Sequence, residues 1–154
     1  MSAILLGVWD SAQSRRAFRL AVTPYVVLDY SEQTTDTTTI KSIGLSNEGV
    51  GPAIVLPLEI RSTMTGSQTF SGWTEIADAL VKRGYRVNGS WVYRGGEAVG
   101  VQRSQTLLRF YGARKADASS DKVDTIVVRL RYKSVYGDEH VDSVTVPLTT
   151  PGSI

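Results

Sequence analysis

The sequence contains no cysteine and only one histidine, His140, among its 154 residues. Without cysteine the chain has no means to form a disulfide bond, a thiolate-ligated metal site, an iron–sulfur cluster or a cysteine nucleophile. A single imidazole excludes sites that need two, and it removes the usual general base from most hydrolytic mechanisms. The sequence therefore predicts a protein that is not an enzyme and that needs no cofactor.

Long hydrophobic runs are also lacking. The apolar run Ala3–Trp9 has seven residues, whereas about 20 are needed to span a bilayer. The run lacks the basic region and the cleavage site of a signal peptide, and Arg15 and Arg16 follow it. Residues 1–17 are therefore interpreted as a short amphipathic helix on the domain, as the trailing end of a membrane anchor with Trp9 at the interface, or as a disordered tail.

Neither sign of charge dominates the chain. Seventeen basic and 15 acidic residues give a formal net charge of +2, and this excess is already present in three arginines near the N-terminus. The remainder is balanced, which argues against a domain that neutralises nucleic-acid phosphates. With 42% hydrophobic and 21% charged residues, the chain has the composition of one ordinary globular domain.

The composition favours sheet, because valine, isoleucine and threonine together outnumber leucine and alanine, and branched side chains fit a strand better than a helix. Alternation of apolar and polar residues from Phe18 to Tyr30 predicts a half-buried strand, which bends at Pro24 and lies at a sheet edge. Ile40 and Ile43 are out of phase and predict a bulge in the next strand. Further strands are predicted over residues 39–46, 54–61, 98–101, 106–111 and 123–133, and a last one ends at Leu148.

Two of these segments alternate clearly enough to predict which side chains face inward. In the segment 54–61, Pro57 also indicates a sheet edge, because proline cannot donate to a ladder. The residues expected to face inward are Ile54, Leu56, Leu58 and Ile60 in the first segment, and Ile126, Val128, Leu130 and Tyr132 in the second.

One helix is predicted over residues 73–83. Acidic residues come early in it, Lys82 and Arg83 come late, and Gly84 stands just past its end. We expect Trp73 to be an anchor of the core and not a platform for a ligand. The apolar stripe of this helix, at the 3.6-residue period, consists of Trp73, Ile76, Ala77, Leu80 and Val81.

The segment Asn47–Ala53 is the most distinctive loop of the sequence. Asn47, Gly49 and Gly51 tolerate positive φ angles. Pro52 fixes the direction in which the chain leaves, so the segment is predicted to be a tight structural turn between two strands. A phosphate cradle is not favoured, because neither a helical pattern nor a Gly-Lys-Ser/Thr motif follows.

A hairpin is predicted over Tyr85–Tyr93, with Asn88 and Gly89 as a type I′ turn. Its register would gather aromatic and basic side chains on one face, and such a face suits contact with another protein. Single-stranded nucleic acid is less favoured as the partner, because the net charge of the domain is near zero. The candidate partner-binding residues are Arg86, Trp91, Tyr93 and Arg94.

Three carboxylates and the single imidazole fall within five positions near the C-terminus. If Asp138, His140 and Asp142 project from one face of a strand, their oxygen and nitrogen atoms could hold a divalent cation. The alternative is a charged hairpin strand whose acidic residues pair with the basic face of the preceding strand and need no metal. That basic face consists of Arg129, Arg131 and Lys133.

Four parts of the chain, taken in order, resemble a group of known proteins. They are the segment Leu20–Pro24, the loop Asn47–Ala53, the helix that carries Trp73, and the segment Tyr132–Gly137. Together they resemble uncharacterised bacterial proteins in which a single N-terminal transmembrane helix precedes an immunoglobulin-like β-sandwich. The resemblance covers about residues 18–148. It implies a mainly β fold, an immunoglobulin-like antiparallel β-sandwich with one inserted amphipathic helix, and a membrane tether, but it supplies no catalytic residues.

These observations divide the chain into an N-terminal apolar and basic segment (residues 1–17), a β-sandwich domain (18–148) and a C-terminal tail (149–154). We expect a non-catalytic binding or structural module that is tethered to a membrane of the cell envelope and contacts another protein. One alternative is a subunit of a viral or other large assembly, in the virion or the cytoplasm, that docks through its N-terminal segment. A second alternative is a metal-binding or enzymatic site around residues 138–142.

Overall fold

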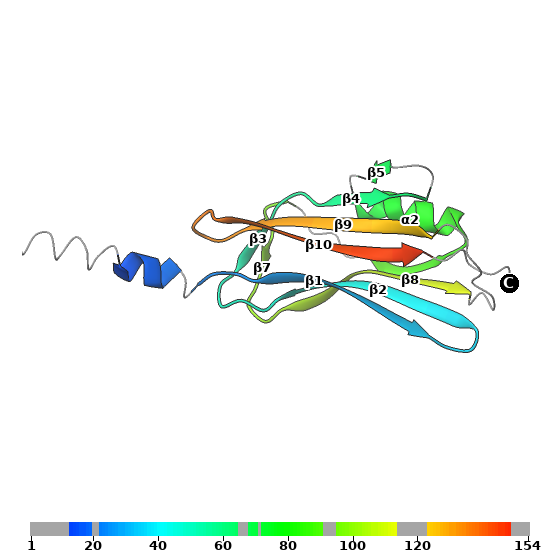
Figure 1. Ribbon diagram of the computed structural model, residues 1–154, viewed down its shortest axis with the longest axis horizontal. Coiled ribbons are helices and arrows are strands. Elements are labelled where there is room, and N and C mark those ends of the chain that lie inside the picture. The colour runs from blue at the N-terminus through cyan, green and yellow to red at the C-terminus, as the bar shows by residue number, and fades with distance from the viewer. Residues whose placement is uncertain are drawn as a thin grey trace, which may run out of the picture.

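The computed structural model describes residues 13–19, 22–64, 68–70, 72–90, 95–113 and 123–148. These residues are mainly β, with a short helix over residues 13–19 and a longer helix, α2. The predicted C-terminal tail (residues 149–154) and the apolar run Ala3–Trp9 lie outside the described residues. The labelled elements (Figure 1) are β1 (Val26–Thr34), β2 (Thr38–Asn47), β3 (Ala53–Val55), β4 (Glu59–Ser62), β5 (Gln68–Phe70), α2 (Trp73–Lys82), β6 (Arg86–Ser90), β7 (Ala98–Val99), β8 (Ser104–Ala113), β9 (Asp124–Lys133) and β10 (Glu139–Leu148).

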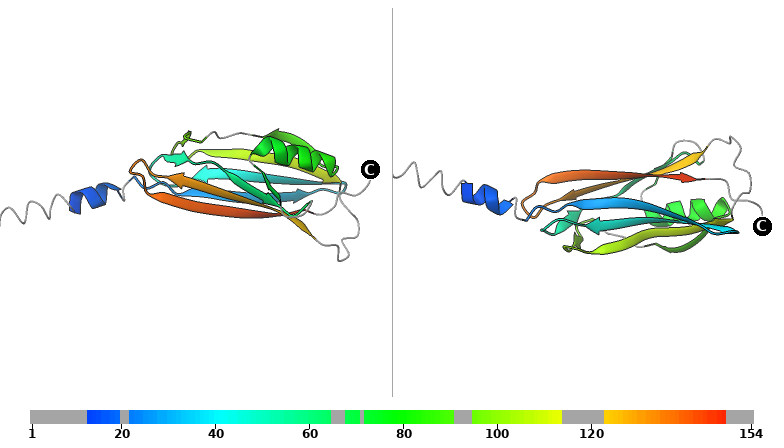
Figure 2. Two further views of the ribbon diagram at one scale, coloured as in Figure 1. Left: turned by 90° about the horizontal axis from the view of Figure 1, so that it is seen from above. Right: turned by 60° about the horizontal axis from the view of Figure 1, so that its bottom comes forward.

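The strands form two antiparallel sheets. The first has the strand order β1-β2-β8-β6. The second has the order β5-β4-β9-β3-β7, in which β4 and β3 pair with successive parts of β9. β10 pairs with β9 along its whole length. The sheets lie as two layers, and α2 packs beside β5 and β6 at one end (Figure 2). This arrangement is consistent with the predicted β-sandwich.

Apolar side chains from both sheets and from α2 form one core. The residues of β9 that were expected to face inward are all buried, and the buried residues of α2 belong to the predicted stripe. Trp73 lies in the core, as predicted, and Gly84, with a φ angle of 87°, follows the end of the helix. The fully buried core residues include Ile43, Leu45, Ile60, Ile76, Leu80, Leu107, Leu108, Phe110, Ile126 and Leu130.

The edge strands β1 and β10 lie next to each other, one from each sheet (Figure 1). In place of backbone pairing, side chains from β10 and from its neighbour β9 bond to the backbone of β1. The Leu28 N–H donates to the Asp142 carboxylate at 2.7 Å, and the Val26 N–H donates to the Tyr132 hydroxyl at 3.3 Å. A strand edge with unpaired donors can recruit another chain, so these bonds protect this edge. The prediction that the first strand lies at a sheet edge is confirmed.

The first strand, however, begins later than predicted. Residues 13–19 form a helix that includes Phe18, whose side chain is 69% exposed, and β1 starts only at Val26. Pro24 has no N–H to donate to a ladder. The Thr23 hydroxyl donates to the Arg19 carbonyl at 2.9 Å, which satisfies an acceptor at the end of the helix. The prediction of a strand from Phe18 is therefore wrong.

The predicted strand over residues 54–61 is in fact two strands, β3 and β4, which both pair with β9. Pro57 lies between them and interrupts the ladder inside the sheet, so it does not mark an edge. The set of alternate residues that faces inward also changes at Pro57. Val55 is buried and Ile54 only half-buried, whereas Ile60 follows the predicted phase.

Asn88 and Gly89 do not form the predicted hairpin turn. They lie within β6, which pairs with β8, and the register of this pair shifts beside them. Gly89 has a φ angle of 84°, so the left-handed conformation that suits glycine is used in an irregular strand and not in a turn. The register of β2 against β8 shifts between Ile43 and Gly44, but the extra residue is Leu107 of β8. Burial alternates regularly along β2 and its register against β1 is unbroken, so the prediction of a bulge in β2 is wrong.

Candidate functional site

The side chain of Asn47 is the centre of a buried hydrogen-bond network at the end of the sandwich next to the helix over residues 13–19. Its Oδ1 atom accepts bonds from the N–H groups of Tyr25 (3.3 Å) and Gly49 (3.1 Å). Its Nδ2 group donates to the carbonyls of Gly51 (2.9 Å) and Val99 (3.1 Å). One fully buried amide therefore holds the start of β1, the β2–β3 loop and β7 together.

The backbone of Asn47 adds a fourth segment to this network. Its N–H donates to the Arg103 carbonyl at 3.0 Å, and its carbonyl accepts from the Gln102 N–H at 2.8 Å. Gln102 has a φ angle of 54°, in the left-handed region that few residues other than glycine adopt. The turn between β7 and β8 is thus fixed to the end of β2.

The glycines of the β2–β3 loop serve close packing and not a positive φ angle. A Cβ atom on Gly51 would lie 1.8 Å from the Val22 carbonyl oxygen, and one on Gly49 would lie 2.2 Å from the Tyr25 nitrogen. The glycines with positive φ in the described residues are elsewhere in the chain. The sequence pattern thus found the connection between two strands, with Pro52 directly before β3, but gave the wrong reason for its glycines.

The turn between β9 and β10 is held by the buried residue Ser134. Its Oγ atom accepts bonds from the N–H groups of Tyr136 (3.1 Å) and Asp138 (3.2 Å), and its N–H donates to the Asp138 carbonyl at 2.9 Å. Gly137 takes a φ angle of 89°, which glycine adopts without strain. The turn therefore holds Val135 and Tyr136 outward, where both are exposed.

Exposed apolar side chains gather at this end of the sandwich. The described residues contain nine exposed large apolar side chains, and six of them lie on these loops or on the adjacent helix. The Arg19 guanidinium lies 5.7 Å from the centre of the Tyr136 ring. The helix that carries Arg19 lies near the β9–β10 turn (Figure 1). We call this set the helix-end surface, and it consists of Phe18, Tyr25, Val50, Val101, Val135 and Tyr136.

The structure does not bring Asp138, His140 and Asp142 together. Asp138 bonds to Ser134, the His140 ring stacks on Tyr132 at 5.2 Å, and the Asp142 carboxylate accepts the β1 backbone bond described above. In the described parts of the chain, no group of three His, Cys, Asp or Glu side chains is placed to hold a metal ion. Arg131 instead pairs with Glu139 at 2.8 Å, as the charged-hairpin alternative predicts.

The predicted partner-binding residues are only partly described. Arg86 is exposed on β6, an edge strand of the first sheet, opposite Tyr111 of β8. The other three members, Trp91, Tyr93 and Arg94, lie outside the described residues. Whether these four side chains form one face stays a prediction.

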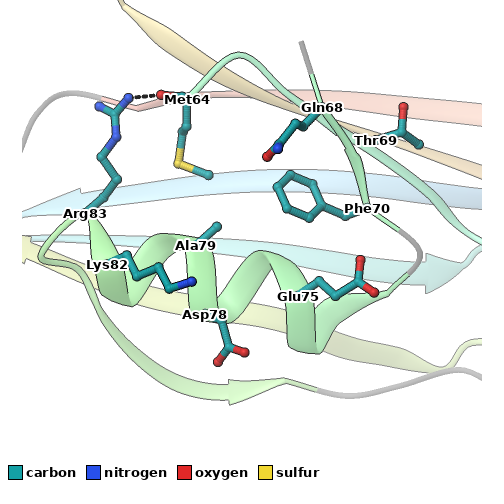
Figure 3. Close-up of a pocket in the computed structure, with 9 residues that line it drawn as sticks. All are labelled: Met64, Gln68, Thr69, Phe70, Glu75, Asp78, Ala79, Lys82 and Arg83. Carbon is teal, nitrogen blue, oxygen red and sulfur yellow. Dashed lines mark hydrogen bonds between the residues drawn. The ribbon is translucent and has the colours of Figure 1, made fainter. Parts of the chain in front are cut away.

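A hollow of about 660 Å³ lies between α2 and β5 (Figure 3). Met64, Phe70 and Ala79 give it apolar walls, and the charged residues around it come mainly from α2. The Arg83 guanidinium donates to the Met64 carbonyl and pairs with Asp124 at 2.7 Å, which ties the end of the helix to the segment after β4 and to β9. No pattern in the sequence predicts this hollow, because its walls meet only through tertiary packing.

A second buried network joins the two sheets at the opposite end of β2. Lys41 is 2% exposed, and its Nζ donates to the Pro147 carbonyl at 2.6 Å and pairs with Glu32 at 3.2 Å. The Tyr30 hydroxyl donates to the same Glu32 carboxylate, and the Tyr30 ring lies 5.9 Å from Nζ. The alternation of Lys41 with Ile43, Leu45 and Asn47 was the signal in the sequence that places this lysine on the inner face.

These contacts shift the pKa values of two members of the network. Burial, followed by the hydrogen bond to Glu32 and the charge of that residue, raises the pKa of Tyr30 above its ordinary range. Burial acts to raise the pKa of Glu32 as well, but the hydrogen bond from Tyr30 and the charge of Lys41 outweigh it, so the pKa of Glu32 is lowered.

The lowered pKa of Glu32 predicts a loss of stability in acid. A carboxyl whose pKa is lower in the folded than in the unfolded state contributes stability above its unfolded pKa of about 4.3, and this contribution falls as the pH drops through the folded pKa. We therefore expect Glu32→Gln to be less stable than the wild type at pH 7 and the two stabilities to converge in acid. Urea unfolding between neutral and acidic pH measures this, and a constant difference would contradict the prediction.

Comparison of the chain with protein-family models, curated proteins and solved structures found no match. The resemblance to tethered bacterial β-sandwich proteins therefore stays a prediction. Among the described residues no helix is both long and apolar enough to cross a bilayer.

Proposed function

We propose that the chain is a non-catalytic binding or structural module, an immunoglobulin-like sandwich that its N-terminal segment holds at a membrane of the cell envelope and that contacts another protein. The observation that carries this proposal is the place of the helix over residues 13–19. The helix lies beyond one end of the long axis of the sandwich (Figure 2). The chain thus connects the apolar run Ala3–Trp9 to this end and leaves the opposite end, with α2 and its hollow, open to a partner.

The contacts of the buried polar side chains support a structural role. In the described ranges the buried polar or charged residues are Lys41, Asn47, Ser62 and Ser134. Each bonds to groups that hold strands or turns in place, including the Ser62 hydroxyl, which accepts from the Met64 N–H at 3.2 Å. Their hydrogen-bonding capacity is used in the fold, as expected of a scaffold.

The path of the chain supports the immunoglobulin-like part of the proposal. Consecutive strands change sheets repeatedly: β2 leads to β3, β5 to β6, β6 to β7, β7 to β8 and β8 to β9 across the two layers. Such crossings between two antiparallel sheets are typical of Greek-key sandwiches. The inserted α2 lies on one of these crossings, between β5 and β6.

Membrane fractionation of cells that express the chain tests the tether. We expect the chain in the membrane pellet, and we expect the triple variant Ile4→Ser, Leu5→Ser, Leu6→Ser in the supernatant, because serine removes the apolar surface that enters lipid. The matched control replaces three exposed apolar residues elsewhere, Val81→Ser, Val123→Ser and Val141→Ser, and should stay in the pellet.

Recovery of the wild-type chain in the supernatant would contradict the tether. If that soluble chain eluted from a sizing column as a large particle, and the triple variant as a monomer, the alternative of a subunit docking through its N-terminal segment would replace it.

A further inference from the structure

We propose that the helix-end surface itself rests on the interface of a bilayer that contains anionic lipid. This inference depends on the proposed tether and adds to it the face of the sandwich that meets the lipid. The tether alone requires only that residues near the N-terminus enter the membrane. The inference requires that loops far apart in the sequence, around residues 25, 50, 101 and 135, touch it at the same time.

The first argument is the way these apolar side chains are displayed. Val50 is 62% exposed and Val135 51% exposed, although the loop of each is held by hydrogen bonds to a buried side chain, Asn47 or Ser134. Rigid loops that hold apolar side chains outward, grouped at one end, are typical of a contact surface. Two members, Tyr25 and Tyr136, have rings with an apolar body and a polar hydroxyl, which suits the boundary between lipid and water.

The second argument is charge. The helix over residues 13–19 carries Arg15, Arg16 and Arg19, all exposed, and no acidic residue. Basic side chains next to an apolar segment are attracted to the anionic headgroups of a bilayer. The contact of Arg19 with the Tyr136 ring places this positive charge beside the apolar loops. The nearby acidic residues Glu48 and Asp138 accept hydrogen bonds from Ser46 and Ser134.

The third argument is position. The apolar run Ala3–Trp9 connects to the end of the sandwich that carries the helix-end surface, so a bilayer that the run enters lies beside this surface. Basic residues and further apolar surface strengthen the attachment of an apolar anchor. The helix-end surface supplies both at the end of the sandwich to which the run connects. These observations favour a bilayer over a second copy of the chain.

The absence of cysteine allows a direct test. A single introduced cysteine on the full chain takes an environment-sensitive fluorophore at one known place. The test positions are Val50→Cys and Val135→Cys, on the helix-end surface. The controls are Val81→Cys on α2 and Val123→Cys before β9, which replace the same residue type at 55% and 54% exposure. Each labelled chain is mixed with vesicles of phosphatidylcholine containing a minority of phosphatidylglycerol, with and without a nitroxide-labelled lipid.

We expect the labels at positions 50 and 135 to shift to shorter emission wavelength and to be quenched by the nitroxide, while labels at 81 and 123 keep the emission of water. Without phosphatidylglycerol, vesicle binding should weaken by roughly 100-fold, because three arginines lose their anionic partners. If the chain sediments with vesicles but all four labels report water, this surface does not touch lipid and only the tether stands. If the chain does not sediment with vesicles, the tether fails as well. A concentration-dependent shift at 50 and 135 without vesicles would assign the surface to a second copy instead.

Discussion

Replacement of Asn47 by alanine should lower the free energy of unfolding by about 3–5 kcal/mol. The side chain is fully buried and makes four hydrogen bonds, two as acceptor and two as donor. Alanine leaves two N–H groups and two carbonyls without these partners in a site where the amide excluded water. Each group left unsatisfied costs about 1–3 kcal/mol, and the total stays at the low end because the Tyr25 and Gly49 N–H groups are only part-buried and water can reach them. Urea unfolding followed by circular dichroism measures the change.

Two further variants make this prediction specific. Asn47→Asp keeps the acceptor for Tyr25 and Gly49 but loses the donors to Gly51 and Val99, so we expect it to be destabilised as well. The matched control is Asn88→Ala on β6, where the asparagine is exposed, and its effect should stay within about 0.5 kcal/mol. A loss of less than 1 kcal/mol for Asn47→Ala would mean that the loops are held in another way.

Replacement of Asn47 by alanine should also weaken the proposed lipid contact of one loop without affecting the tether. Tyr25 and the β2–β3 loop, which carries Val50, depend on this amide for their position. We therefore expect the fluorophore at position 50 to lose most of its emission shift in an Asn47→Ala background, while the label at 135, held by Ser134, keeps it.

Local periodicity predicts the elements whose burial pattern is set within one segment. In β9 every second residue from Ile126 is buried, and in α2 the stripe with Trp73 faces the core. Both segments carry enough regular residues for the apolar face to be read from the sequence. The two isoleucines that are out of phase, Ile40 and Ile43, instead lie on opposite faces of a regular β2, and the extra residue is Leu107 of β8.

The errors arise where a partner strand decides the conformation. Asn88 and Gly89 satisfy the requirements of a tight turn, yet β8 pairs with the residues on both sides of them, and the two lie at an irregularity of β6. The glycines of the β2–β3 loop are required by the backbone at Val22 and Tyr25, and the sequence does not indicate that these segments meet. The helix-end surface was missed for the same reason, because its loops come together only through the fold.

Replacement of Lys41 by alanine should cost about 3–4 kcal/mol of stability, because it opens a cavity beside β10 and removes the donor to the Pro147 carbonyl. Lys41→Met keeps the buried stem and should cost only about 1–2 kcal/mol, since it loses the hydrogen bonds alone. The control is Lys82→Ala on the exposed side of α2, which should stay within about 0.5 kcal/mol. A methionine variant as stable as the wild type would show that the aliphatic part of Lys41 supplies all of its contribution to stability and that its hydrogen bonds supply none.

A double variant decides whether the charge of Lys41 acts through Glu32. Lys41→Met and Glu32→Gln each remove the same ion pair, so together they should cost less than the sum of the two single changes. The Glu32 side chain is 38% exposed, and water can take over part of its solvation when the lysine is lost. The Pro147 carbonyl, in contrast, loses its hydrogen-bond donor in Lys41→Met whichever residue is at position 32. Most of the cost of Lys41→Met should therefore persist in the Glu32→Gln background. Full additivity would mean that the ion pair with β1, inside the first sheet, adds nothing to stability, and that Lys41 acts only through its bond to β10 of the second sheet.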